Sequence, residues 1–380
     1  MTAPSPVGAL VEHFADLEDP RVERTKRHPL LSILAIALCG VIVGAESWDE
    51  IEEFGNAKAE WLGHVLDLPH GIPSHDTFNR VFAALDPHQF RACFTAWMQA
   101  VAEVVPTEVI ALDGKTLRRS HDRYTGREAI HLISAWASRN QLVLAQERVD
   151  RKANEITALP HLLQVLALKG CLVSIDAIGC QREIAQQILD QGGDYVLALK
   201  ENQPSLLEEV QTLFAQARDQ VFVDLVEDQA QEVNKGHGRV EIRRHTVISD
   251  PDVLAWLDDE YGWPGLHAIG MVEAERRIST SRSTQTRYYL LSRALSARDF
   301  GAVVRSHWGI ENQVHWTLDV TFGEDQSRIR AGNAAENVAL LRQLALNLVR
   351  HQPTKCLSIK AKRKKAGWDN AYLLQILQGL

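Results

Sequence analysis

Hydrophobic and polar positions follow three different patterns along the chain. In residues 1–105 the apolar positions recur at helical spacing without strand-like alternation, which predicts an all-helical N-terminal domain. The most apolar run, Leu30 to Ala45, lies between Pro29 and Glu46 and is short for a membrane span. We therefore expect a buried helix there and no membrane segment.

Residues 106–220 contain short apolar runs typical of strands, which predict the order β-β-β-α-β-α-β. Three successive strands favour an antiparallel meander, and strands that alternate with helices favour parallel additions to the same sheet. The run "EVIALD" is expected to end a strand on Asp113, with Gly114 and Lys115 in a turn, and "CLVSIDA" to end one on Asp176. The fold class is α/β.

Residues 221–296 interrupt this order with new alternating runs, which predict a β-rich insertion of antiparallel strands. The first of these expected strands is "VFVDLVED", residues 221–228. Helical spacing returns in residues 297–350, and residues 351–380 are expected to form a basic tail with a short helix.

The charge distribution is uneven. The net charge is −8, but residues 201–260 hold 14 Asp and Glu against 5 Lys and Arg, so the rest of the chain is close to neutral. Basic clusters near residues 21–27 and 355–365 leave room for a local DNA-binding face. Five Cys without metal-binding spacing are typical of reduced thiols in a cytosolic protein.

Acidic side chains in apolar surroundings are the candidates for chemistry. Asp113 and Asp176 each close an apolar strand, where ligands commonly bind in open α/β sheets. A turn or cap residue is the plainer interpretation of each Asp alone, but a buried carboxylate is costly without a partner or cation. Two such acids on one predicted sheet favour a cation site.

The stretch "RSHWGIENQVHWTLDV", residues 305–320, is expected to form one helix. His307, Glu311, His315 and Asp319 recur every four residues beside an apolar stripe of Ile310, Val314, Thr317 or Leu318, and Thr321. If the helix crosses the sheet, Glu311 comes within reach of Asp113 and Asp176. Three carboxylates suit Mg²⁺ or Mn²⁺, and two such ions suit phosphoryl transfer.

The chain resembles insertion-sequence DDE transposases of the ISAs type, which include the H-repeat-associated proteins. The motifs that carry the resemblance cover nearly the whole chain: "FADLEDPR", "GIPSHDTFNRVF", "IALDGKTLR", "HLISAWAS", "LPHLLQVLALKGCLVSIDAIGCQREIA", "GGDYVLALKENQ" and "HWGIENQVHWTLDVTFGEDQSRIR". The resemblance implies a ribonuclease-H-like catalytic core in which Asp113, Asp176 and Glu311 are the catalytic triad and bind two Mg²⁺ or Mn²⁺ ions.

The resemblance also implies strand cleavage at the ends of the element, followed by attack of the freed 3′-OH on target DNA. The implied partners are terminal inverted repeats, target DNA and a second copy of the chain in a synaptic dimer or larger assembly. The N-terminal domain is expected to bind the DNA ends, and the location to be the bacterial cytoplasm at the nucleoid. Related transposases carry Tyr-x-x-Arg-x-x-x-Glu-x(6)-Lys around the third acid, but this chain has Val304, His307, Glu311 and Leu318.

Candidate DNA contacts each have a structural alternative. Lys115 fits a solvated turn, Lys200 and Gln203 fit a capped loop, Trp308 and Trp316 fit packing, and the basic hairpin "NKGHGRVEIRR" and the stretch "KAKRKKAG" fit solvated segments. The full set of candidate DNA contacts is Lys115, Lys200, Gln203, Arg305, His307, Trp308, Asn312, His315, Arg328 and Arg330.

Two rival functions remain. A zinc site on His307, Glu311 and His315 would need two His eight residues apart, about 12 Å along a helix, to bind one ion. A domesticated or inactive relative would bind DNA without transposing, and all three acids argue for retained chemistry.

Overall fold

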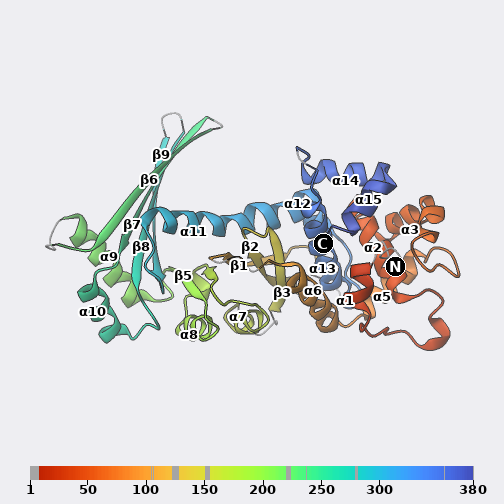
Figure 1. The fold of residues 1–380 in the computed structure, drawn as a ribbon, viewed down its shortest axis with the longest axis horizontal. Helices are drawn as coiled ribbons and strands as arrows, with labels where there is room; N and C mark the ends of the chain where they lie inside the picture. Colours follow the sequence, from red (N-terminus) through yellow and green to blue (C-terminus); the bar gives the residue numbers. More distant parts are fainter. Residues whose placement is uncertain are drawn as a thin grey trace.

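The computed structural model describes residues 8–103, 105, 107–121, 128–149, 155–219, 224–236, 238–278, 281–354 and 356–379. Its long axis runs from a projecting group of strands at one end to a bundle of N- and C-terminal helices at the other (Figure 1). One long helix, α11, lies between the two ends.

The N-terminal region is helical, as its periodicity predicts. Its helices are α1 (Gly8–Phe14), α2 (Leu30–Val43), α3 (Trp48–Ala57), α4 (Ala59–Gly63), α5 (His75–Ala84) and α6 (Pro87–Val101), with a short 3₁₀ turn η1 (Glu23–Thr25). Residues Ser32 to Ile42 of α2 are all buried, which confirms the expectation of a buried helix. Burial of its apolar side chains supplies the main driving force for this bundle.

Within the described residues, no single helix is long and apolar enough to cross a membrane. Only α2 and α3 together meet that criterion, and they are bent by 97°.

A nine-stranded mixed sheet forms the rest of the core, in the order β3-β2-β1-β4-β5-β9-β8-β7-β6. Its first part is β1 (Val109–Leu117), β2 (Ile130–Ala137), β3 (Leu142–Val149), β4 (Leu172–Ile175) and β5 (Asp194–Leu199). The first three strands are antiparallel, β4 is parallel to β1 and β5 is parallel to β4, which confirms the predicted pairing.

The predicted end of β1 is wrong. The strand continues past Asp113 to Leu117, because β2 keeps pairing with it from Ile110↔Ala137 to Leu117↔Ile130. Only the pairing with β4 stops at Leu112↔Ile175. Gly114 and Lys115 therefore lie within a strand and not in a turn.

The later strands extend the same sheet. They are β6 (Glu227–Gly236), β7 (Arg239–Ile248), β8 (Ala268–Ile278) and β9 (Ser281–Leu291), all antiparallel to their neighbours. The connection to the first part is β9 on β5, from Val196↔Leu291 to Leu199↔Tyr288. We refer to β6–β9 as the arm. The expected strand at 221–228 is wrong for residues 224–226, which lie outside any strand, and right for residues 227 and 228, where β6 begins. Residues 220–223 lie outside the described part.

Helices cover both faces of the sheet. One face carries α7 (Glu155–Gln164), α8 (Arg182–Asp190), α9 (Pro204–Arg218) and α10 (Pro251–Tyr261), and the other carries α11 (Ala297–Gly309). The sequence patterns did not predict α9 and α10. Two glycines bring α11 close to the arm: a Cβ on Gly270 would lie 2.6 Å from the Phe300 ring, and one on Gly301 would lie 2.8 Å from the His245 ring.

The chain after α11 returns to the N-terminal helices. A π-helical segment η3 (Ile310–His315) leads into α12 (Trp316–Thr321), and then the short turn η4 (Glu324–Gln326) leads to α13 (Ala334–His351). Nearly all of α13 is buried against α2, α5 and α6. The last helices are α14 (Ile359–Trp368) and α15 (Asn370–Leu377).

The expected solvated basic tail is instead a packed helix. Lys362 donates to the carbonyl oxygens of Val349, Arg350 and Gln352, at the end of α13. These last carbonyls of a helix have no partner within the helix, so a basic side chain stabilises them.

Arg363, also in α14, joins two other helix ends. It donates to the carbonyls of Val41 and Ile42 in α2 and to that of Thr321 in α12, and its guanidinium lies over the Phe322 ring. Among the described basic residues of this segment, Lys360 and Lys364 are exposed, as predicted for the tail.

Candidate active site

Asp113 and Asp176 lie side by side on neighbouring parallel strands. Each directly follows the last residue pair between β1 and β4, Leu112↔Ile175. The side chain of Asp176 begins the short 3₁₀ turn η2 (Ala177–Gly179) and accepts a hydrogen bond from the Ile178 amide at 3.2 Å. The register of a buried parallel pair therefore brings the two carboxylates together.

Asp113 has few groups that stabilise its charged form. Its Oδ1 accepts from the Gly114 amide at 2.9 Å, and its Oδ2 lies 3.4 Å from His315 Nδ1. Burial, and then the negative charges of Glu311 and Asp176, raise the pKa of Asp113 to about 7. Burial and the charge of Glu155 also raise the pKa of Asp176, while nearby Lys200 opposes the rise.

Glu311 projects from the π-helical segment between α11 and α12. Its neighbours Ile310 and Val314 are fully buried, whereas Glu311 is exposed. The expected apolar stripe is confirmed for Ile310, Val314, Thr317 and Leu318. A π-helical segment closes its hydrogen bonds over five residues where an α-helix closes them over four, and such segments are frequent at functional sites. The sequence predicted a single helix but not this local widening.

The chemistry of these donors fits hard divalent cations. Carboxylate oxygens are the preferred ligands of Mg²⁺ and Mn²⁺, and a cation would offset the repulsion that raises the pKa of Asp113. As the side chains stand, no group of three or more His, Cys, Asp or Glu in the described residues is close enough to hold a metal ion.

The two histidines of the same helix are largely buried and neutral. Burial lowers the pKa of His307 to about 4 and that of His315 to about 3, the latter with a contribution from the charge of Lys115. A neutral imidazole makes no charge-assisted bond to phosphate at neutral pH. His315 therefore contacts Asp113 and does not add positive charge to the surface at neutral pH.

Lys115 is held by two acids of the following segment. Its Nζ lies 2.5 Å from Asp319 and also pairs with Glu324, whose side chain is almost fully buried. Burial lowers the pKa of this amine, but the charges of Glu324 and Asp319 outweigh that effect and keep the pKa raised. This ion pair joins β1 to the chain after the third acid.

The other predicted contacts lie in varied surroundings. Lys200 is exposed near Asp176, and Gln203 donates to the Cys180 carbonyl at 3.1 Å, as the capped-loop alternative expects. Asn312 donates to the Trp308 carbonyl, and Arg305 pairs with Glu232 of the arm.

The remaining candidates are surface residues. Trp308 lies beneath the Arg287 guanidinium and Trp316 is 59% exposed. Arg328 is exposed and Arg330 is half-buried. DNA contact by these residues stays a prediction.

Two residues near the acids were missed from the sequence, Glu155 and His131. Glu155 is the first residue of α7, and its carboxylate bonds to His131 on β2. An acidic residue in the first turn of a helix is common for reasons of the helix dipole alone, so the sequence offered no specific signal.

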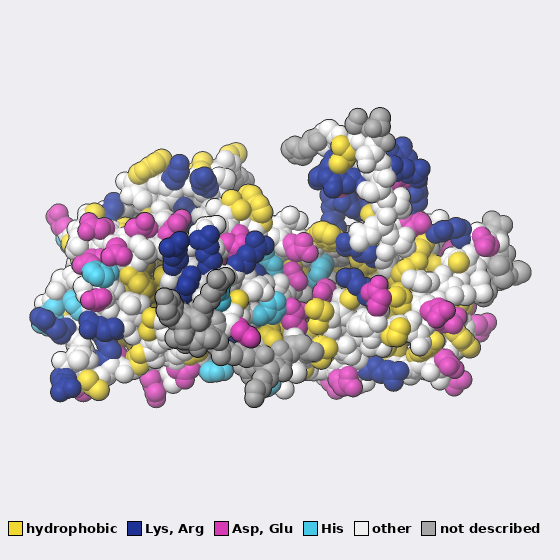
Figure 2. All heavy atoms as spheres, turned by 180° about the vertical axis from the view of Figure 1, so that it is seen from behind, with side chains coloured by type: hydrophobic (Ala, Val, Ile, Leu, Met, Phe, Trp, Pro, Cys, Tyr) yellow, Lys and Arg dark blue, Asp and Glu magenta, His cyan; other side chains and the backbone are white. Residues whose placement is uncertain are grey.

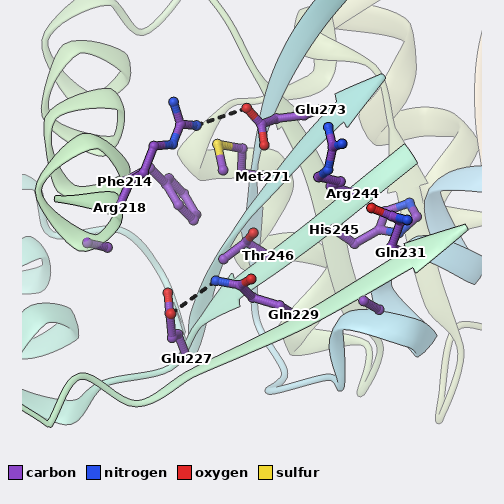
Figure 3. A pocket seen from close by; sticks show the side chains of 12 residues that line it. Phe214, Arg218, Glu227, Gln229, Gln231, Arg244, His245, Thr246, Met271 and Glu273 are labelled. Carbon is purple, nitrogen blue, oxygen red and sulfur yellow. Dashed lines mark hydrogen bonds and ion pairs between the residues drawn. The ribbon is translucent and has the colours of Figure 1, made fainter. Parts of the chain in front are cut away.

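A separate pocket of about 490 Å³ lies between α9 and the arm (Figure 3). Phe214 and Met271 line it together with Gln229, Thr246 and Arg244. Asp113, Asp176 and Glu311 are not among its lining residues, so this pocket is distinct from the acidic site.

Comparison with known proteins identifies the family. A family model described as "Transposase DDE domain" matches residues 105–348. A second family model, described as "DDE_Tnp_1-associated", matches residues 11–98. "Putative protein YbfL" of Escherichia coli K12 is 39% identical over 97% of this chain and 98% of its own length. "H repeat-associated putative transposase YhhI" of the same strain is 38% identical over 97% of this chain and 98% of its own length. The chain therefore belongs to the family of transposases with a DDE domain.

Proposed function

We propose that this chain is an active DDE transposase that cuts DNA at the ends of its element and transfers the freed strand to a target. The observation that carries the proposal is the pair Asp113 and Asp176 on adjacent strands, with the charge of Glu311 acting on Asp113. We further propose that β3-β2-β1-β4-β5 form a ribonuclease-H-like core. Its three antiparallel and two parallel strands in this order support that fold.

Each acid has a part in the proposed reaction. Bound Mg²⁺ or Mn²⁺ would supply Lewis acidity and a deprotonated water at neutral pH. Asp113 and Asp176 fix one side of the site from the rigid sheet, and Glu311 closes it from the helix. The water oxygen bonds to phosphorus as the bond to the 3′ oxygen breaks, and that oxygen takes up a proton. In the second step this 3′-OH attacks a target phosphate in line, and a target 3′ oxygen leaves.

Positive charge on the arm supports DNA as the substrate. Lys and Arg side chains gather on its projecting end (dark blue, upper right in Figure 2). The outer parts of the four strands carry Lys235, Arg239, Arg243, Arg244, Arg276, Arg277, Arg282 and Arg287, against Glu232, Glu241, Glu273 and Glu275. A basic surface on a chain of net charge −8 favours a polyanionic partner. We also propose that the N-terminal helices bind the element ends and that a second copy of the chain joins the synaptic complex.

The test is cleavage of a supercoiled plasmid that carries the sequences flanking the gene, with Mg²⁺ or Mn²⁺. Wild type should cut at the element ends, and Glu311→Gln should bind the same ends without cutting, because it keeps its shape but loses a charge. A matched control is Glu183→Gln, an exposed acid in the first turn of α8. Binding without cutting by both wild type and Glu311→Gln would favour an inactive DNA-binding relative. Full cutting by Glu311→Gln would contradict the assignment of the third acid.

A further inference from the structure

Two loops meet beside Asp176 at the edge of the sheet. One is the 3₁₀ turn η2, which follows β4, and the other is the loop between β5 and α9. Asn202 Nδ2 in the second loop donates to the carbonyl oxygen of Ala177 at 2.6 Å and to that of Cys180 at 3.3 Å. Gln203 Nε2 also donates to the Cys180 carbonyl, at 3.1 Å. The loop after β5 therefore binds the turn after β4 at both of its ends.

The turn η2 sets the direction of the Asp176 carboxylate. Asp176 directly precedes the turn, and its side chain accepts a hydrogen bond from the Ile178 amide at 3.2 Å. Burial, and then the charge of Glu155, raise the pKa of Asp176, and hydrogen bonds from the amides of Ile178 and Gly179 oppose that rise. A movement of the turn would therefore change both the orientation of this carboxylate and its pKa.

Close packing ties the same turn to the end of β4. A Cβ on Gly179 would lie 2.3 Å from Ile175 Cγ2 and 3.2 Å from Leu159 Cδ1 of α7. The turn thus folds back onto the residue that directly precedes Asp176, and glycine leaves the room for it. On the side of β5 the turn is held by the hydrogen bonds of Asn202. Apolar packing and hydrogen bonds therefore fix the turn from two sides.

Capping of helix α9 does not account for the position of Asn202. A capping Asn accepts hydrogen bonds through its side-chain oxygen from the first amides of its own helix. The side chain of Asn202 instead bonds to two carbonyls, 25 and 22 residues earlier in the chain, which identifies the bonded atom as the donor nitrogen. Among the described residues, no side chain caps α9. The hydrogen bonds of Asn202 therefore act on the loop of the neighbouring acid.

We propose that Asn202 is a positioning residue for Asp176. Its two hydrogen bonds keep the turn η2 closed, and the closed turn directs the Asp176 carboxylate to its place beside Asp113. Gln203 supports the same turn through its bond to Cys180. The inference rests on the proposed function, because Asp176 is one of the acids of that reaction. The loop after β5 thereby contributes to cleavage through the second acid, without contact between Asn202 and the reacting phosphate.

The test combines hydrogen exchange of the full-length protein with the plasmid cleavage assay. Asn202→Leu keeps the approximate size of the side chain but removes its donor, so the amides of Ile178, Gly179 and Cys180 should exchange about tenfold faster. The same variant should lower kcat for cleavage about tenfold and leave KM for the DNA within twofold, because it disturbs an acid and not a DNA contact. The matched control is Glu201→Gln, the exposed neighbour in the same loop, which should change neither measurement.

The outcomes separate this inference from the proposed function. Unchanged exchange of the turn in Asn202→Leu would overturn the inference, and so would faster exchange with the kcat of wild type. If wild type does not cut, the proposed function fails, and the exchange rates alone still decide whether Asn202 holds the turn that carries Asp176. Thermal unfolding checks that each variant folds. If Asn202→Leu does not fold, Asn202→Asp, which replaces the donor with an acceptor of the same shape, takes its place in both measurements.

Discussion

Burial of Asp113 changes the free energy of unfolding by an amount that depends on pH. Its carboxyl is 18% exposed and lies near Asp176 and Glu311, so its pKa is about 7 compared with 3.8 for an ordinary Asp. The folded state therefore binds a proton at Asp113 more tightly than the unfolded state does. The stabilisation that this proton provides is complete below pH 3.8 and is lost as the pH rises through about 7.

We predict that Asp113→Asn stabilises the metal-free protein at pH 8 but not at pH 4. The neutral amide avoids the buried charge, so the difference in unfolding temperature from wild type should grow between those two pH values. Thermal unfolding in EDTA across this range measures the difference. The exposed Asp219→Asn is the control and should show no such trend. A constant difference between Asp113→Asn and wild type would contradict the raised pKa.

Close packing of α11 on the arm depends on glycine at one position of the helix and not at another. A Cβ on Gly301 would lie 2.8 to 2.9 Å from three atoms of the His245 ring, which is buried against Phe300. A Cβ on Gly309, at the end of the same helix, meets only ordinary contacts from 3.5 Å outward. The intrinsic preference of a helix for Ala over Gly is the same for both.

Opposite effects are therefore predicted for two equal substitutions. Gly301→Ala should lower the free energy of unfolding by about 1–3 kcal/mol, because it overpacks the helix against the sheet. Gly309→Ala should leave that free energy unchanged or raise it by about 1 kcal/mol, through helix propensity. Urea denaturation of both variants beside wild type measures the two signs. Stabilisation by Gly301→Ala would mean that α11 can move off the arm without cost.

Several elements could be predicted from the sequence because their signals are local. Period-2 runs located β7 and β8, and unbroken apolar runs located α2 and β4. The start of β6 and the end of β1 were misplaced, because the length of pairing with the next strand, and not the apolar pattern of the strand itself, decides where each strand starts and stops. Glu227 and Asp228 belong to an edge strand that no apolar pattern reveals.

At the candidate site, the sequence predicted the three acids that lie in recognisable motifs but not the residues that surround them. Asp113, Asp176 and Glu311 stood in motifs, whereas Glu155 looked like any acid at the start of a helix. Lys115 looked like a turn residue beside DNA and is instead paired with Asp319 and Glu324. Such pairs join segments about 200 residues apart, and only the three-dimensional fold brings them together.

At the scale of the whole molecule, the C-terminal helix α14 joins the N-terminal helix α2 to α12, a helix next to the candidate site. Arg363 is 6% exposed and binds carbonyls at the ends of both α2 and α12, the helix that follows Glu311. Burial lowers the pKa of this guanidinium to about 10, so it remains charged at neutral pH. The C-terminal segment is thus part of the core and not an appendage.

We predict that Arg363→Met lowers the free energy of unfolding by about 3 kcal/mol, roughly 1 kcal/mol for each carbonyl left without a donor. The neighbouring Lys364→Met removes an exposed charge and should change it by less than about 0.5 kcal/mol. Guanidinium denaturation compares the two. Equal effects would show that general positive charge, and not capping of the helix ends, is what α14 contributes.

The bond between Arg363 and Ile42 spans 321 residues, which sets an order of events during protein synthesis. While the ribosome is still adding the final helices, the end of α2 has no cap and the segment that bears Glu311 has no anchor. The acids then exist on the nascent chain without a finished site around them. The proposed DNA-cutting site is thereby completed only after α14 has been synthesised, and a chain that stops before Arg363 lacks these hydrogen bonds.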